Sequence, residues 1–300
     1  MNEPSFAVVV AAYNAERTLA ATVESVLAQT RAEFELAIVD DGSTDGTLEL
    51  AESFDDPRVK VFRQENGGTA AARNAGIAGT RAPLVAILDS DDLWLPRYLE
   101  TMGRLLDGNS GAALGYTDAW VLDDSSGRIS RRHAASSVNP PQRPPDDPRE
   151  LLELLLRGNF VFASATLRRT VVEEVGLFDR RCNECEDYEL WLRFAAHGCR
   201  FVRSEGPLAI YRNRAGSKSS NELRLLGGVR DCLDVVLSEY ELDDDLRAAA
   251  TRRRAAVNAE LTGRLPRIRR RLRGHTRRVM APYLWRRTPP PEVAGVLRGL

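Results

Sequence analysis

The most constraining feature of the sequence is an alternation, over residues 6–92, of short apolar runs with segments of helical periodicity. After the first run comes Asn14, a candidate helix N-cap, and then Leu19, Val23 and Val26 at helical spacing. The alternation continues, so that strands are predicted at residues 6–12, 36–39, 59–62 and 83–88. Such repeats predict an α/β fold with a mostly parallel sheet and right-handed crossovers.

Acidic clusters follow the second and the fourth of these strands. Asp40 and Asp41 end the second strand, and residues 89–92 read Asp-Ser-Asp-Asp. Ligands of open α/β sheets bind beyond the carboxyl ends of the strands. The two clusters are therefore expected to meet at one ligand-binding edge.

Asp89 and Asp91 are candidate ligands of a metal ion. Two carboxylates separated by one residue, where a strand ends, can both turn towards one hard cation. Mg²⁺ and Mn²⁺ prefer such oxygen ligands and share their other positions with substrate phosphates. The alternative is a solvated turn.

Asp41 and Tyr13 are candidate nucleotide contacts. The carboxylate of Asp41 could accept hydrogen bonds from a base or a ribose, and Tyr13, after the first strand, could stack on the base. The alternatives are an ordinary turn, with a helix N-cap at residues 43–45, and ordinary packing of the tyrosine.

Asp187 is the candidate general base. It follows Glu186 at the start of a predicted helix, where the helix dipole favours carboxylates in any protein. A transferase that activates a hydroxyl needs a carboxylate or imidazole beside it. The three histidines lie in a loop, at a helix end and in the basic tail, so Asp187 is preferred.

Five segments, in order, resemble glycosyltransferase family 2. They are VVVAAYNAE (8–16), IVDDGSTDGT (38–47), ARNAG (72–76), LDSDD (88–92) and EDYELWLR (186–193). The resemblance covers about residues 5–220 and implies a GT-A-like fold. It implies an inverting transfer of a sugar from a nucleotide diphosphate sugar to a hydroxyl of a saccharide or lipid-linked acceptor, as in polysaccharide biosynthesis.

The resemblance also implies roles for single residues. Tyr13 and Asp41 would hold the base, Arg73 would lie on the nucleotide side, Asp89 would reach the ribose or the metal, Asp91 would bind Mn²⁺ or Mg²⁺, and Asp187 would be the base with Glu186 beside it. Family members often carry Tyr-Arg-x-His near the end of the domain. Here Arg214 replaces the histidine, and its guanidinium could neutralise the leaving diphosphate.

Two other classes of protein stay open. A nucleotidyltransferase on a similar sheet would want a glycine-rich basic loop after the first strand, where residues 13–17 read YNAER. A non-catalytic scaffold that binds nucleotide sugar would not need the acidic residues. A dinucleotide oxidoreductase is disfavoured because no GxGxxG follows the first strand.

Charge divides the chain into a glycosyltransferase domain at residues 1–220 and a helical basic extension at residues 221–300. The extension carries 17 arginines against 10 acidic residues. Within the first domain, residues 123–150 are predicted to form a long surface loop and residues 160–167 a strand. The segments 123–150 and 158–166 are expected to contact the acceptor.

Residues 251–278 hold eleven arginines and one acidic residue, with an apolar stripe at helical spacing. The segment could pack on the catalytic domain or anchor the protein to an anionic membrane surface. Nucleic-acid binding is not expected, because the segment lacks aromatic residues. No apolar run is long enough to span a membrane, so we expect a cytoplasmic protein with free cysteines. The alternative location is peripheral, at the inner face of the membrane.

Overall fold

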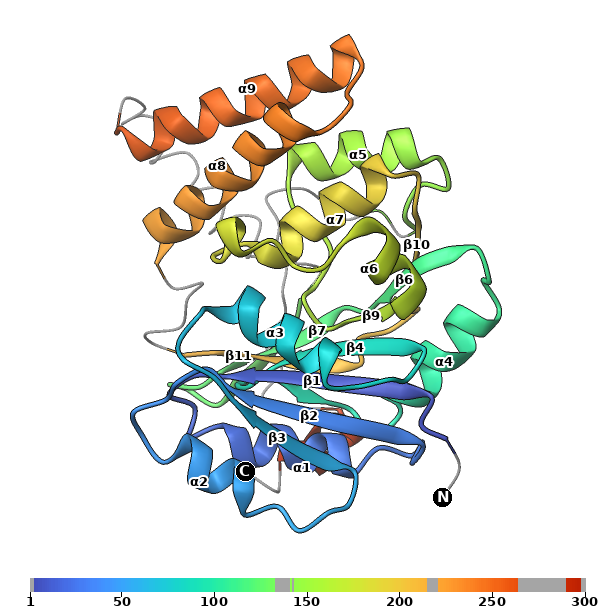
Figure 1. The fold of residues 1–300 in the computed structure, drawn as a ribbon, viewed down its shortest axis with the longest axis vertical. Helices are drawn as coiled ribbons and strands as arrows, with labels where there is room; N and C mark the ends of the chain where they lie inside the picture. The colour runs from blue at the N-terminus through green and yellow to red at the C-terminus, as the bar shows by residue number, and fades with distance from the viewer. Residues whose placement is uncertain (1–2, 133–140, 142, 215–220, 264–289, 298–300) are drawn as a thin grey trace.

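A seven-stranded sheet forms the centre of the molecule (Figure 1). The computed structural model describes residues 3–132, 141, 143–214, 221–263 and 290–297. Across the sheet the order is β10-β6-β9-β4-β1-β2-β3, and neighbours run parallel except on either side of β9. The strands are β1 (Phe6–Ala12), β2 (Phe34–Asp40), β3 (Val59–Arg63), β4 (Leu84–Asp89), β6 (Ala112–Tyr116), β9 (Ala165–Arg168) and β10 (Arg200–Arg203).

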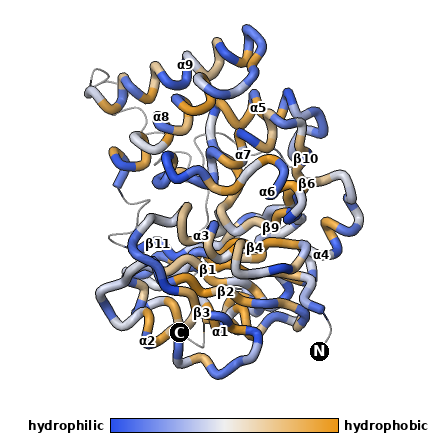
Figure 2. Tube along the Cα trace, in the orientation of Figure 1, coloured by the Kyte–Doolittle hydropathy of each residue, from blue (hydrophilic) through white to orange (hydrophobic). Residues whose placement is uncertain are grey.

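The four strands predicted from apolar runs are present. Both faces of β1, β2 and β4 are covered, whereas β3 at the edge of the sheet is partly exposed. Val8 and Val10 of β1 pack on one face with α1 (Leu19–Leu27) and α4 (Tyr98–Asp107), while Val9 packs on the other. Figure 2 shows β1, β2 and β4 as strongly hydrophobic. Because side chains on both faces of these strands are buried, most of their positions are apolar. Helices α2 (Thr47–Glu52) and α3 (Thr69–Ala78) complete the repeats.

The predicted N-cap at Asn14 is wrong. Helix α1 begins at Leu19, after Thr18 at the cap position. Asn14 has a φ of 50°, and its side-chain oxygen accepts a hydrogen bond from the backbone N–H of Thr44 at 2.9 Å. The asparagine therefore joins two loops instead of starting a helix. Asparagine tolerates this left-handed conformation better than most residues.

A second, four-stranded sheet has the order β5-β11-β7-β8. Its strands are β5 (Leu93–Trp94), β7 (Ala119–Asp123), β8 (Arg128–Arg132) and β11 (Ala209–Asn213). The short helix α11 (Pro291–Leu297) places the buried Val293 among the side chains of this sheet. Part of the C-terminal region therefore packs on the first domain.

The long loop predicted at residues 123–150 is replaced in part by regular structure. Strands β7 and β8 form a hairpin whose turn is held by Asp123, since its side chain accepts hydrogen bonds from the N–H groups of Ser125 and Ser126. Helix α5 (Pro148–Arg157) begins with Asp147 as its N-cap. Residues 133–140 and 142 lie outside the described residues. The strand predicted at 160–167 is shorter, because Phe160 and Val161 enter the core before β9 begins.

A helical layer covers one face of the central sheet (Figure 1). It contains α5, α6 (Arg169–Val175), the short 3₁₀ helix η1 (Arg180–Cys182), α7 (Glu186–Ala196), α8 (Glu222–Glu239) and α9 (Asp244–Leu261). Trp191 of α7, Val236 of α8 and Val257 of α9 belong to one buried cluster. In the described residues, no helix is both long and apolar enough to cross a membrane.

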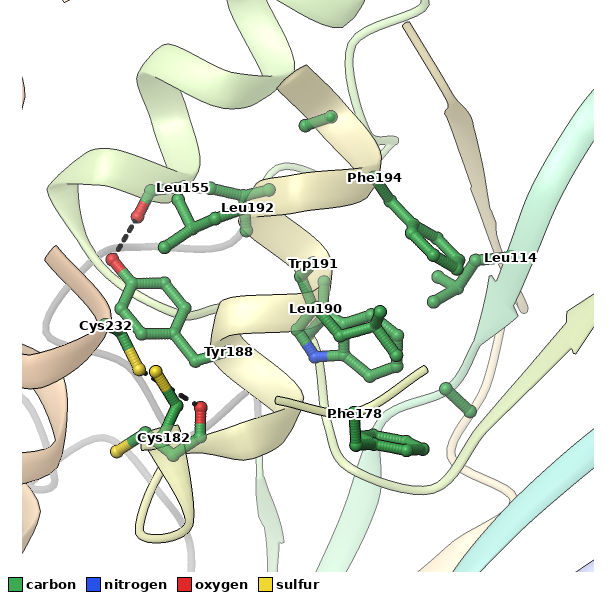
Figure 3. Packing of buried hydrophobic residues seen from close by; sticks show 14 of the residues in the cluster. Leu114, Leu155, Phe178, Cys182, Tyr188, Leu190, Trp191, Leu192, Phe194 and Cys232 are labelled. Atoms are coloured by element: carbon green, nitrogen blue, oxygen red, sulfur yellow. Dashed lines mark hydrogen bonds between the residues drawn. The ribbon is translucent and has the colours of Figure 1, made fainter. Parts of the chain in front are cut away.

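Three of the four free cysteines lie inside this layer. Cys232 of α8 donates a hydrogen bond to the backbone carbonyl of Cys185, which directly precedes α7 (Figure 3). The hydroxyl of Tyr188 donates to the carbonyl of Leu155 at 2.7 Å, which joins α7 to α5. These contacts hold the first turn of α7 in place beneath α8.

Candidate active site

The loops after β1 and β2 are fastened to each other at the carboxyl edge of the sheet. The backbone N–H of Asn14 donates to the hydroxyl of Ser43 at 3.0 Å, and the N–H of Gly46 donates to Glu16 at 2.8 Å. Between these contacts and β1, the side chain of Tyr13 remains half exposed. Tyr13 therefore lies at the predicted edge, with its ring available for stacking.

Asp41 is almost completely buried and already accepts three hydrogen bonds. The donors are the side chain of Gln64 at 2.7 Å and the backbone N–H groups of Gly67 and Gly68, at 2.9 and 2.8 Å. Its carboxylate thus shapes the loop that leads from β3 to α3. The sequence suggested a free carboxylate at Asp41, whereas in the structure this carboxylate holds the loop between β3 and α3.

Asn183 is a residue of this region that sequence reasoning missed. Gly68 has a φ of 85°, and a Cβ atom there would lie 2.2 Å from the side-chain nitrogen of Asn183. The side-chain oxygen of Asn183 accepts a hydrogen bond from the N–H of Ala70 at 3.2 Å. The loop before α3 therefore contacts the segment before α7, and no local pattern in the sequence indicates this contact.

Arg73, on α3, is buried between the two acidic groups of the site. Its Nη2 atom donates a hydrogen bond to Oδ1 of Asp89 at 2.6 Å, and its Nη1 atom lies 3.0 Å from Oε1 of Glu186. The negative charges of Asp89, Glu186 and Asp187 raise the pKa of Arg73, although burial alone would lower it. The arginine predicted on the nucleotide side thus lies below the surface of the site.

Asp91 lies beside Arg214, which follows β11. The Nε atom of Arg214 donates to Oδ2 of Asp91 at 3.0 Å. Burial raises the pKa of Asp91, and the negative charge of Asp89 raises it further, while Arg214 opposes this rise. The structure therefore places Arg214 beside Asp91, whose charge also interacts with that of Asp89.

Arg212 anchors the acidic loop and was given no role from the sequence. Its backbone N–H donates to the side chain of Asp92 at 2.9 Å, and its Nε atom donates to the backbone carbonyl of Asp91 at 3.2 Å. Both Arg212 and Asp92 are buried. Strand β11 therefore fixes the conformation of the loop that carries Asp91.

Asp187 is in the first turn of α7. Its carboxylate accepts the N–H of Tyr188 at 2.7 Å, and the nearby side chain of Asn159 acts to lower its pKa. Burial raises the pKa of Asp187, and the nearby charge of Arg73 opposes the rise. Asn159 lies in the segment expected to contact the acceptor, but its contact with Asp187 could not be derived from the sequence.

The acidic residues fit a cation that keeps some water or substrate ligands. In the part of the chain that the structure describes, no three His, Cys, Asp or Glu side chains are grouped so that they could hold a metal ion. Mg²⁺ and Mn²⁺ are often held by one or two carboxylates together with phosphate oxygens. The mutual repulsion of Asp89 and Asp91, which raises the pKa of Asp91, is what a divalent cation would relieve.

Comparison with known proteins identifies the family of the chain. The sequence profile described as "Glycosyl transferase family 2" matches residues 7–176. The chain is similar to the succinoglycan biosynthesis protein ExoU of Rhizobium meliloti, with 32% identity over 82% of this chain and 73% of ExoU. It is also similar to the Escherichia coli protein WfaP, a "UDP-Glc:alpha-D-GlcNAc-diphosphoundecaprenol beta-1,3-glucosyltransferase", with 28% identity over 73% of this chain and 81% of WfaP.

The fold is similar to that of a solved glycosyltransferase structure. Residues 1–349 of TarS from S. aureus, crystallised with UDP-GlcNAc, match with a TM-score of 0.63 and 19% identity. The match covers 87% of this chain and 72% of that one, and the shared architecture is a GT-A-like α/β fold. With the predicted fold and family confirmed, the chain belongs to glycosyl transferase family 2 and is a sugar transferase.

Proposed function

We propose that the protein transfers a sugar from a nucleoside diphosphate sugar to an acceptor hydroxyl in one inverting displacement, with Asp187 as the general base. The observation that carries the proposal is the convergence of two acidic groups on one buried cation. Asp89 at the end of β4 and the acidic pair that opens α7 all act on the charge of Arg73. The donor side and the acceptor side of a transferase site therefore lie next to each other.

The donor is held at the edge formed by β1, β2 and β4. Tyr13 would stack on the base, the loop shaped by Asp41 would surround the nucleoside, and Asp89 would face the ribose or a metal ion. The name of WfaP specifies UDP-Glc, and TarS was solved with UDP-GlcNAc. Both support a uridine nucleotide as the first donor to be tested.

Asp91 and Asp89 are the residues that would hold Mn²⁺ or Mg²⁺. When bound, the ion would supply positive charge and Lewis acidity at the diphosphate. Arg214 is close enough to Asp91 to add its own charge on the same side. Because the protein positions these charges in advance, little reorganisation is needed as negative charge develops on the leaving group.

Asp187 would take the proton of the acceptor hydroxyl as the acceptor oxygen bonds to the anomeric carbon. The bond from the anomeric carbon to the diphosphate oxygen breaks in the same step, so the anomeric configuration inverts. A raised pKa strengthens a carboxylate as a base, and burial supplies that rise at Asp187. The side chain of Asn159, which acts to lower that pKa, would favour the ionised form of the carboxylate.

The acceptor is proposed to be a saccharide carried on a lipid. The name of WfaP describes a diphosphoundecaprenol-linked acceptor. The sequence of this chain carries an arginine-rich segment at residues 251–278. Residues 264–278 lie outside the described residues, while residues 251–261 form the end of α9. Basic residues attract anionic membrane surfaces, which would bring the enzyme to such an acceptor.

A donor screen followed by an activity measurement tests the proposal. UDP-, dTDP- and GDP-sugars are compared by thermal shift, and the best is then assayed for hydrolysis and transfer with MnCl₂. With a nucleotide sugar as substrate, a sugar transferase releases the nucleoside diphosphate, whereas a nucleotidyltransferase, which attacks phosphorus, would release a sugar 1-phosphate. Stabilisation by a nucleotide sugar without turnover would favour the non-catalytic scaffold.

A further inference from the structure

The proposed chemistry needs carboxylates on two separate elements, β4 and α7, to keep a fixed relative position. We propose that Arg73 is the positioning residue that fixes it, with one buried guanidinium joining Asp89 of β4 to Glu186 in the first turn of α7. This inference rests on the proposed function, because Asp187 is the neighbour of Glu186. It assigns Arg73 to the link between the two halves of the site, and not to contact with the nucleotide.

The two ends of the guanidinium contact different elements. Nη2 lies 2.6 Å from Asp89 and Nη1 lies 3.0 Å from Glu186, while the side chain of Arg73 is 3% exposed. The ring of Phe178 lies 5.2 Å below the guanidinium carbon. A planar guanidinium with several donors can serve two carboxylates at once, which the single ammonium of lysine does less well.

The backbone that carries Arg73 is itself fixed to the sheet. A Cβ atom on Gly76 would lie 2.5 Å from a methyl group of Val9, so α3 packs closely against β1 at this glycine. This contact sets the height of α3 above the sheet. Arg73, one turn earlier on the helix, is thereby placed beside the end of β4.

Helix α3 is also fixed to the segment before α7. The side chain of Asn74 donates to the carbonyl of Phe178 at 2.9 Å and accepts from the N–H of the same residue at 3.0 Å. The helix that carries Arg73 is therefore held both by β1 and by the segment before α7. Its burial excludes direct stacking on a base in this conformation, and the carboxylates around it stabilise its charge.

A double-mutant cycle tests whether Arg73 and Glu186 act as one unit. The probe is the nucleotide sugar that gives the largest thermal shift among UDP-, dTDP- and GDP-sugars. We expect Arg73→Gln and Glu186→Gln each to lower kcat by about 30-fold, with KM for the donor within about threefold, and the double variant to be no slower than the slower single variant. Losses that multiply in the double variant, or a KM that rises as much as kcat falls, would overturn the link.

Hydrogen–deuterium exchange provides a readout that does not depend on turnover. Arg73→Gln should raise deuterium uptake in residues 87–92 and in residues 183–190, because each segment loses a partner. The matched control is Arg169→Gln, since Arg169 is also a largely buried arginine. It donates to the carbonyls of Ile77, near the end of α3, and of Ala82, just before β4 begins. That variant should raise uptake near residues 76–83 only. Unchanged uptake in either segment of the Arg73 variant contradicts the proposal.

Arg73→Lys keeps a positive charge, and it tests the link even if Arg73→Gln fails to fold. We expect it to fold and to lose about tenfold in kcat, since one ammonium serves one carboxylate well. Full activity in this variant would show that a point charge suffices and would overturn the two-ended bridge. Equal turnover by the wild-type protein and Asp187→Asn would contradict the proposed function. The deuterium-exchange experiment would still test whether Arg73 links β4 to α7.

Discussion

The guanidinium of Arg214 lies 3.0 Å from the carboxylate of Asp91, although 123 residues separate them in the chain. Arg214 stands where the Tyr-Arg-x-His pattern of related sequences would place a histidine. An imidazole could share a cation with Asp91, whereas a guanidinium competes with the cation for the carboxylate. Arg214 can therefore form an ion pair either with Asp91 or with the diphosphate of a bound donor.

Arg214→Gln tests this competition. Without the positive charge, Asp91 should bind Mn²⁺ more tightly, so the Mn²⁺ concentration for half-maximal turnover should fall severalfold. The value of kcat should fall about tenfold, because a charge-assisted contact with the leaving diphosphate is lost. The measurement is a MnCl₂ titration of turnover, with the exposed Arg97→Gln as control. A higher Mn²⁺ requirement in Arg214→Gln would mean that the arginine supports the cation site.

Asp91 and its neighbour Asp92 form a matched pair that separates function from stability. Asp91→Asn should abolish metal-dependent turnover and leave the melting temperature nearly unchanged, since its side chain pairs with the partly exposed Arg214. Asp92→Asn should lower the melting temperature, because the buried carboxylate of Asp92 accepts the N–H of Arg212. Melting curves and MnCl₂-dependent turnover are measured for both. Near wild-type turnover in Asp91→Asn would remove it from the site.

Asp187→Asn should remove transfer while leaving the affinity for the donor within a few-fold, because a base acts on the acceptor. Burial raises the pKa of this carboxyl in the folded protein, so its ionisation costs folding free energy as the pH rises through and above its unfolded pKa. The variant should therefore be as stable as the wild type, or more stable, at pH 7. Melting temperatures at pH 4 and pH 7 measure this. The melting temperature of the variant relative to that of the wild type should be higher at pH 7 than at pH 4.

The turnover rate of the wild-type protein should rise as Asp187 becomes ionised. Asp187 acts as a base only when ionised, so kcat should rise with pH through a pKa above the ordinary value of an aspartate. Stopped assays from pH 4 to pH 8 give the profile. A pH-independent rate, or failure of Asp187→Asn to bind the donor nucleotide, would show that the residue has another role.

The strands of the central sheet were predictable because burial on both faces leaves an unbroken apolar run, as in β1. The hairpin of β7 and β8 was not, since its turn depends on hydrogen bonds to Asp123 and its residues show no clear periodicity. The edge that carries Asp89 was predictable because parallel strands end together. Asn159 and Arg212 could not be found in this way, because their contacts join segments distant in sequence.

The last prediction concerns the arginine-rich segment at residues 251–278, which the structure describes only as far as α9. Deleting residues 251–278 would damage the fold, because it would remove the end of α9, where Val257 is fully buried. Substitution is therefore the better test, and we choose Arg267→Gln, Arg270→Gln and Arg271→Gln together. Three exposed arginines elsewhere, Arg81, Arg97 and Arg104, replaced by glutamine in a second protein, form the matched control.

If the segment anchors the enzyme, the wild-type protein should sediment with anionic liposomes and remain in solution with neutral ones. Each arginine near such a surface contributes about 1 kcal/mol, so the triple variant should partition about 100-fold more weakly. The control triple variant should bind as the wild type does, and moderate salt should release part of either protein. Turnover with a soluble acceptor should be the same in all three proteins, since none of the substituted residues belongs to the proposed site. Equal sedimentation of both triple variants with anionic liposomes would remove the membrane anchor and leave packing on the catalytic domain as the role of the segment.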